Sequence, residues 1–201
     1  MDGVESAKYS PRVAELLLPD PPLCDEAVLL RGWSEADVPA IVAACRDPTI
    51  ARWTAMIPSP YSENDALEWI TGQGPARRDG RALELAITGR QSGEIFGAVA
   101  LSNVSQVQLR SGVGYWLAPQ ARGRGYATAA VRLVARWGFD RLGLARLELF
   151  TDVDNVASQN VATRCGFRRE GLLRSHLLVR SRGERRDSLV YGLLAEDLVE
   201  L

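Results

Sequence analysis

The sequence predicts an α+β domain of three layers, in which helices cover both faces of a mixed sheet of about seven strands. Apolar and amphipathic segments follow one another in the order β-α-α-β-β-β-α-β-α-β-β. The polar segment 88–93 joins two of these strands as a hairpin. With 201 residues, the chain is long enough for one such domain with a sizeable core.

The first half of the domain begins with a strand over residues 27–31. Ser34, followed three positions later by an acidic residue, forms a capping box ahead of a helix with apolar residues at helical spacing. A second short helix is predicted over 48–53. Two prolines make 54–61 a loop, and Ser62 caps the next helix.

Polar and glycine-containing turns divide the rest of the chain into short strands and two further helices. The longer of these helices is apolar on one side and charged on the other, as expected for a helix packed on a sheet. The predicted strands are 83–88, 94–101, 113–117, 147–151, 167–178 and 188–194, and the predicted helices are 128–139 and 157–164.

Composition limits the class of protein. Prolines break residues 1–22, which are predicted to form an arm ahead of a domain at 23–201. A formal net charge of −1 provides no general attraction to nucleic acid or to an anionic membrane. No apolar run approaches the ~20 residues of a membrane span. Three cysteines without framework spacing favour a reducing compartment, so a cytoplasmic protein is expected.

The most informative segment is Gln120-Ala121-Arg122-Gly123-Arg124-Gly125-Tyr126-Ala127, between an aromatic strand and a helix. Glycines let the backbone approach an anion, and the first N–H groups of a helix point at it. The segment therefore predicts a phosphorylated ligand. It lacks the Lys-Ser/Thr of a Walker loop, and a dinucleotide fingerprint would have three spaced glycines near the start of a βαβ unit.

The order and spacing of several motifs resemble one family. Gln120-x-x-Gly123-x-Gly125 resembles the acyl-CoA pyrophosphate loop of the GNAT N-acetyltransferases. The resemblance runs from about Val28 to Leu194 and implies the GNAT fold, with a sheet splayed at the acyl-CoA site. Motifs typical of the RimJ/RimL branch are Gly114-Tyr115-Trp116-Leu117, Asn155-Val156-Ala157-Ser158, Cys165-Gly166-Phe167 and Glu170-Gly171.

By this resemblance, acetyl-CoA is the co-substrate and no metal is expected. Backbone amides of residues 122–127 would bind the pyrophosphate, and the backbone before the turn would pair with the pantetheine arm and offer an N–H to the thioester oxygen. Asn155 would hydrogen-bond the arm; its alternative role is helix capping. The expected cofactor-binding residues are Trp116, Leu117, Gln120, Arg122, Gly123, Arg124, Gly125, Tyr126, Ala127, Asn155 and Ser158.

The resemblance also implies a general acid. Ser158 would lie near the sulfur and donate a proton to the leaving thiolate. Its alternative role is to satisfy a backbone group in the first helical turn. Many members of the wider family place a tyrosine seven residues after the motif's asparagine, where this chain has Ala162, and that difference favours Ser158.

The general base is less well defined. Members of the branch often carry a glutamate before the Gly-Tyr-Trp run, where this chain has Gly112. A second position that is acidic in the resembled family corresponds to about Leu177 in this chain. Its neighbour is His176, whose neutral imidazole could accept a proton. Glu84 is the carboxylate candidate. The alternatives are a structural histidine, a solvated strand glutamate, and proton removal through a water chain.

The acceptor side is expected to be aromatic and apolar. Trp53, Met56 and Tyr61 lie in or beside the loop that borders the acceptor cleft in the resembled family, and Tyr115 lies on the central strand. We expect these residues to contact the substrate, with core packing as the alternative for Trp53 and Tyr115.

Together these motifs predict an N-acetyltransferase that transfers an acetyl group from acetyl-CoA to a primary amine by direct attack in a ternary complex. The acceptor would be a protein N-terminal amine or a small-molecule amine. A homodimer is a further expectation, and the N-terminal arm is a candidate contributor to its interface. Two other classes stay open: a non-catalytic acyl-CoA-binding module, and a protein that binds another phosphorylated ligand.

Overall fold

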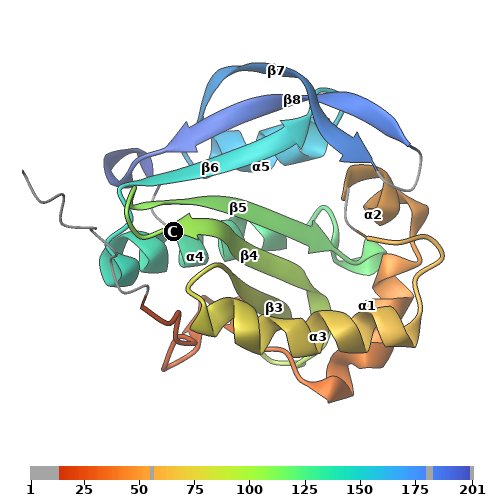
Figure 1. Ribbon diagram of the computed structural model, residues 1–201. Helices are drawn as coiled ribbons and strands as arrows, with labels where there is room; N and C mark the ends of the chain where they lie inside the picture. The colour runs from red at the N-terminus through yellow and green to blue at the C-terminus, as the bar shows by residue number, and fades with distance from the viewer. Residues whose placement is uncertain (1–13, 55–56, 180–182, 200–201) are drawn as a thin grey trace, which may run out of the picture.

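A single mixed sheet forms the centre of the molecule in the computed structural model, which describes residues 14–54, 57–179 and 183–199 (Figure 1). Its strand order is β1-β2-β3-β4-β5-β6-β8-β7, and β5 with β6 is the one parallel pair of the described sheet. The strands are β1 (Leu23–Cys24), β2 (Val28–Arg31), β3 (Leu83–Gly89), β4 (Ile95–Ser105), β5 (Arg110–Leu117), β6 (Arg146–Asp152), β7 (Arg168–Val179) and β8 (Glu184–Leu193).

Helices cover both faces of this sheet. Helices α1 and α3 lie on one face and α4 and α5 on the other, while α2 stands near the carboxyl end of β5 (Figure 1). No helix of the described residues is long and apolar enough to cross a membrane. The helices are α1 (Val38–Cys45), α2 (Pro48–Trp53), α3 (Glu63–Arg78), α4 (Tyr126–Leu142) and α5 (Val156–Arg164), with short 3-10 turns η1 (Glu35–Asp37), η2 (Pro119–Ala121) and η3 (Ala195–Asp197).

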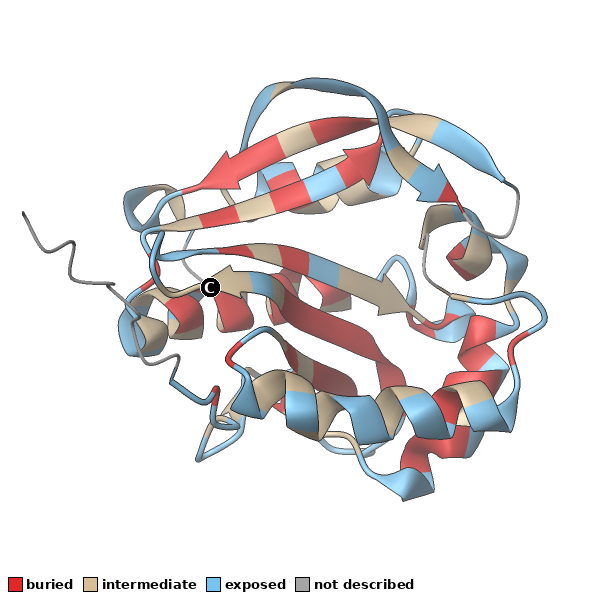
Figure 2. Ribbon diagram, viewed as in Figure 1, coloured by how far each residue is buried: buried red, intermediate tan, exposed pale blue. Residues whose placement is uncertain are grey.

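The main core lies between the sheet and α4. Val131 and Val134 on the apolar side of α4 belong to the same buried cluster as Leu85, Val99 and Leu147 from three strands. Figure 2 shows buried residues concentrated on the central strands and on the sides of the helices that face them. Burial of these side chains is the principal force that holds the layers together.

A second core lies between the sheet and the pair α1 and α3. Ile41 and Ala66 are buried there, and three tryptophans pack at its border. Trp33 stacks on Trp116 with ring centroids 6.3 Å apart and meets Trp69 edge-on at 5.2 Å. This cluster fixes the side chain of Trp116 and therefore the carboxyl end of β5.

The sheet is splayed between β5 and β6, as the sequence predicts. These strands pair from Arg110 with Arg146 to Gly112 with Glu148, and no pairing between them continues beyond that point in the described sheet. The strands then diverge toward their carboxyl ends (Figure 1). The second half of β5 is thereby left with an edge that no neighbouring strand covers.

The predicted elements are confirmed with small shifts in their ends. The eighth strand is the two-residue β1, which lies ahead of the first predicted strand and pairs with β2. Helix α4 begins at Tyr126 rather than at the predicted residue 128, because the left-handed Gly125 is its N-cap. Helix α3 begins after Ser62, whose side chain accepts a hydrogen bond from the N–H of Asp65 in the predicted manner.

The described part of the predicted arm packs on the domain. Leu16 is 2% exposed and belongs to the main core, and its N–H donates to the carbonyl of Arg77. Gln106 holds Ala14 with two hydrogen bonds, of 2.8 and 2.6 Å, to its N–H and its carbonyl. Residues 1–13 lie outside the described residues.

Candidate active site

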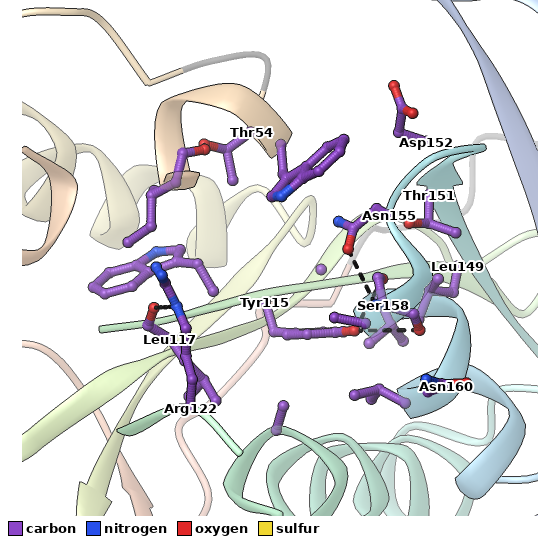
Figure 3. Close-up of a pocket in the computed structure, with 18 of the residues that line it drawn as sticks. Thr54, Tyr115, Leu117, Arg122, Leu149, Thr151, Asp152, Asn155, Ser158 and Asn160 are labelled. Atoms are coloured by element: carbon purple, nitrogen blue, oxygen red, sulfur yellow. Dashed lines mark hydrogen bonds between the residues drawn. The ribbon is translucent and has the colours of Figure 1, made fainter. Parts of the chain in front are cut away.

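A cavity of ≈ 500 Å³ lies where β5 and β6 separate. Its walls come from α2, β5, the turn before α4, the carboxyl end of β6 and α5, so segments far apart in the sequence meet there (Figure 3). Ten of the residues predicted for the site line it: Trp53, Tyr115, Trp116, Leu117, Arg122, Gly123, Gly125, Ala127, Asn155 and Ser158.

The glycine turn has the backbone that an anion site requires. Gly123 has φ +74° and Gly125 has φ +83°, a conformation that residues with a Cβ rarely adopt. A Cβ placed on either glycine would meet no atom within 4 Å. Within the described part of the chain no side chain caps α4, so its first N–H groups are available to a ligand. These features fit the pyrophosphate of an acyl-CoA.

Three of the predicted cofactor-binding residues of the loop lie outside the cavity wall. Gln120 and Arg124 are exposed, and the ring of Tyr126 stacks on Phe96 with centroids 4.4 Å apart. The side chain of Tyr126 therefore anchors the turn to the sheet, and only its backbone N–H is suited to meet a ligand. Sequence patterns do not separate these two uses of one residue.

Arg122 ties the turn to the residue that begins α2. Its Nε donates to the carbonyl of Leu117 at 3.1 Å, and its Nη2 pairs with the carboxylate of Asp47. Asp47 also caps α2 by accepting from the N–H of Thr49 at 3.1 Å. The positive charge of Arg122 is thus compensated within the protein, so its contribution to an anion would come from its backbone.

Three polar residues form a connected chain in the cavity wall. The hydroxyl of Tyr115 donates to Oγ of Ser158 at 2.9 Å, and the N–H of Ser158 donates to Oδ1 of Asn155 at 3.1 Å (Figure 3). Burial raises the pKa of Tyr115 to about 12, so its phenol stays protonated at neutral pH. The capping role of Asn155 is present, and its amide nitrogen is not used in that contact.

An ion pair holds the segment that leads into α5. Asp152 is 7% exposed and lines the cavity, and Nη2 of Arg186 on β8 donates to its Oδ1 at 3.0 Å. The same Nη2 donates to Asp154 at 2.6 Å. Because α5 begins just after these residues, the ion pair fixes the positions of Asn155 and Ser158.

The two candidate bases have different surroundings. His176 is exposed and outside the cavity wall; its ring lies 5.1 Å from that of Phe150, which lines the cavity with Leu177. Glu84 is half-buried on β3 and also outside the wall. Burial raises the pKa of Glu84 to about 7, which suits proton transfer near neutral pH.

Strand register aligns Glu84 with the cavity. Glu84 pairs with Ala100, and Ala100 pairs with Gly114, which lines the cavity. Directly opposed residues of antiparallel strands point to the same face, so these three share one face of the sheet. The two residues between the carboxylate and the cavity are small, and a Cβ on Gly114 would meet no atom within 4 Å.

The predicted acceptor residues are distributed unevenly. Trp53 lines the cavity, and the guanidinium of Arg52 lies 4.4 Å from the centre of its ring. Tyr61 is 6% exposed and lies in the second core, outside the cavity wall. Met56 lies outside the described residues.

Comparisons with known proteins agree with this geometry. A family model described as an acetyltransferase (GNAT) domain matches residues 27–168. The chain is 26% identical over 174 residues to the uncharacterized N-acetyltransferase YoaA of Bacillus subtilis, covering 87% of this chain and 97% of that protein. It is 35% identical over 105 residues to the putative ribosomal N-acetyltransferase YdaF of the same organism, and this match covers 52% of this chain and 56% of YdaF.

A solved structure with a bound ligand is also similar. Mycobacterium smegmatis RimJ, in complex with CoA-disulfide, superposes with a TM-score of 0.79 at 28% sequence identity. The match covers 89% of this chain and 88% of RimJ. The splayed sheet and the cavity are therefore part of a fold that binds CoA in a related protein.

Proposed function

The chain belongs to the GNAT family of acyl-CoA-dependent N-acetyltransferases, and from this premise we propose that it transfers an acetyl group from acetyl-CoA to a primary amine by direct attack in a ternary complex. The observation that carries the proposal is the continuity of one cavity. It extends from the glycine turn at Gly123 and Gly125, past Ser158, to Trp53 on α2. This continuity supports a mechanism in which both reactants are bound at once.

Acetyl-CoA is proposed to bind along β5 and the start of α4. The backbone N–H groups of the glycine turn and of the first turn of α4 would hold the pyrophosphate. The uncovered edge of β5 near Trp116 and Leu117 would pair with the pantetheine arm. An N–H of this edge would stabilise the charge that develops on the thioester oxygen.

Ser158 is proposed as the general acid. Its hydroxyl accepts a hydrogen bond from Tyr115, which orients the hydroxyl proton of Ser158 away from the phenol. The proton is then available to a leaving thiolate, and Tyr115, with its raised pKa, can replace it. Tyr115 would thus bring a phenol to the site from β5, whereas many members of the wider family have a tyrosine at the position of Ala162.

Glu84 is proposed as the general base, acting directly or through water across Ala100 and Gly114. Its pKa of about 7 leaves a substantial ionised fraction at neutral pH. His176 is the weaker candidate because it is exposed, whereas Glu84 is half-buried and shares a face of the sheet with Gly114, which lines the cavity. A covalent route through Cys165 is disfavoured, since burial raises the pKa of that thiol to about 12.

The acceptor is proposed to be an amine that enters beside α2, in the form of either a peptide N-terminus or a small molecule. The name of YdaF, a putative ribosomal N-acetyltransferase, favours a protein amine. The test begins with isothermal titration of acetyl-CoA, ATP and NAD into the protein, followed by thiol release with a panel of peptides and small amines. Binding of acetyl-CoA alone and amine-dependent release of CoA are expected; absence of acetyl-CoA binding would overturn the proposal.

A further inference from the structure

Thr151, near the carboxyl end of β6, has a buried hydroxyl that finds no partner among the residues that the structure describes. The residue is 5% exposed and lines the cavity, and its Oγ1 makes no hydrogen bond within the described part of the chain. A buried hydroxyl that has no partner costs stability, because it loses its hydrogen bonds to water and gains none. Such a group calls for an explanation.

Two nearby side-chain oxygens already accept hydrogen bonds within the protein. Oδ1 of Asn155 accepts from the N–H of Ser158, and Oγ of Ser158 accepts from Tyr115. Thr151 lies on the same side of the cavity as these residues (Figure 3). Its hydroxyl oxygen is a third polar oxygen in this wall, and unlike the other two it has no hydrogen-bond partner among the described residues.

Strand alternation shows which side of the sheet Thr151 serves. Leu147, Leu149 and Thr151 share one face of β6, and the two leucines belong to the main core with α4. A valine at position 151 would continue this apolar face. The chain instead has a hydroxyl at this position, and Thr151 is one of the residues that line the cavity on the side that holds α4 and Ser158.

We infer that the Thr151 hydroxyl is a hydrogen-bonding partner for an amide group of the pantetheine arm of acyl-CoA. A hydroxyl can donate to an amide carbonyl or accept from an amide N–H. A ligand that extends from the glycine turn to Ser158 passes on this side of the sheet, whereas Phe150 and Asp152 lie on the opposite face, toward the acceptor. The inference rests on the proposed function and adds a specific positioning residue to it.

The test compares Thr151→Val, which keeps the shape and removes the hydroxyl, with Thr151→Ser, which keeps the hydroxyl. Titrations use acetyl-CoA and 3′-phosphoadenosine 5′-diphosphate, which has the phosphates and base of CoA but no pantetheine. Thr151→Val should weaken acetyl-CoA binding by about 5- to 10-fold, the worth of one hydrogen bond, and leave the nucleotide unchanged. Thr151→Ser should bind acetyl-CoA within about twofold of wild type.

Thermal unfolding without ligand provides a second readout. Thr151→Val should unfold at the same temperature as wild type or higher, because the unpaired hydroxyl is gone. Thr151→Ala supports the same comparison should the valine variant fold poorly. Equal acetyl-CoA affinity of Thr151→Val and wild type, or an equal loss for both ligands, would overturn the inference alone. A wild-type protein that does not bind acetyl-CoA would overturn the proposed function as well.

Discussion

The phenol of Tyr115 on β5 donates a 2.9 Å hydrogen bond to the hydroxyl of Ser158 on α5, across the opening between the splayed strands. The hydrogen bond joins a strand of the sheet to a helix that packs beside it. Because the Tyr115 pKa is raised to about 12 by burial, the phenol is a donor throughout the neutral range. This direction of donation leaves the Ser158 proton free for a ligand.

Loss of the proposed acid should affect turnover more than binding. Ser158→Ala should lower kcat by about 100-fold or more, within the range for general acid catalysis, with the Kd for acetyl-CoA nearly unchanged. Tyr115→Phe should lower kcat by about 10-fold, since the serine remains but loses its proton supply. Steady-state kinetics with a matched titration of acetyl-CoA would test this, and an unchanged kcat for Ser158→Ala would remove it from the mechanism.

The glycine turn is tested by a charge at its second glycine. Gly125→Glu should abolish acetyl-CoA binding in a titration, because it adds a negative charge and a side chain beside the expected pyrophosphate. The matched control is Gly143→Glu at the other end of α4. Gly143 also has a left-handed backbone, with φ +63° and open space around it, so its strain is similar. If both variants bind acetyl-CoA like wild type, the turn is a connection only.

Glu84 should give the reaction its dependence on pH. The carboxylate, not the acid, accepts a proton, so kcat/KM should rise as pH increases through about 7, the pKa that burial gives Glu84. Glu84→Gln should lose this rise, whereas Glu94→Gln, in the exposed part of the β3–β4 hairpin, should keep it. Retention of the rise in Glu84→Gln with its loss in His176→Ala would assign the base to the histidine instead.

Glu84 should also make the fold less stable at higher pH. Its folded-state pKa is above the ordinary value of 4.5, so the folded protein holds the proton more tightly than the unfolded chain. The protein therefore loses stability as pH rises from about 4.5 to about 7, and the loss is complete above that range. Chemical unfolding of Glu84→Gln should show a gain over wild type at pH 8 and little gain at pH 4.

The ion pair between Arg186 and Asp152 should support both fold and site. Arg186→Met leaves the buried Asp152 carboxylate without its cation and should lower the free energy of unfolding by about 2 kcal/mol, discounted for partial exposure of the arginine. Adding Asp152→Asn should restore part of this loss, because the buried charge is removed. Urea unfolding of four proteins, wild type, Arg186→Met, Asp152→Asn and the double variant, measures the coupling, and simple additivity would show that the two residues do not interact.

Local features of the site could be predicted from the sequence, because their causes lie within a few residues. The left-handed glycines at 123 and 125 and the Ser62 cap are of this kind. The contact between Tyr115 and Ser158 joins residues 43 positions apart and depends on how α5 packs on the sheet. Tyr61 is predicted to contact the substrate but lies in the second core. An aromatic residue beside a cleft and one in a core have the same sequence pattern, so the sequence does not distinguish them.

The alternation of strand residues carries a further signal about the site. Tyr115 shares its face of β5 with Val113 and Leu117, and this alternation alone places its phenol on the side of the sheet that holds α4 and α5. The setting of Glu84 is harder to anticipate, because it depends on the register that brings Ala100 and Gly114 beside it. Register is a property of the assembled sheet rather than of one segment.

The short ladder from Arg110 to Gly112 is the connection between two halves of the sheet, one that ends in β5 and one that begins with β6. Strands are stiff over a few residues, so a small tilt at this ladder is magnified at their far ends, where Leu117 and Asp152 lie. We therefore expect this ladder, which lies outside the cavity wall, to influence the width of the cavity. Substitutions at Ser111 or Gly112 would therefore alter the fit of acyl donor and amine together.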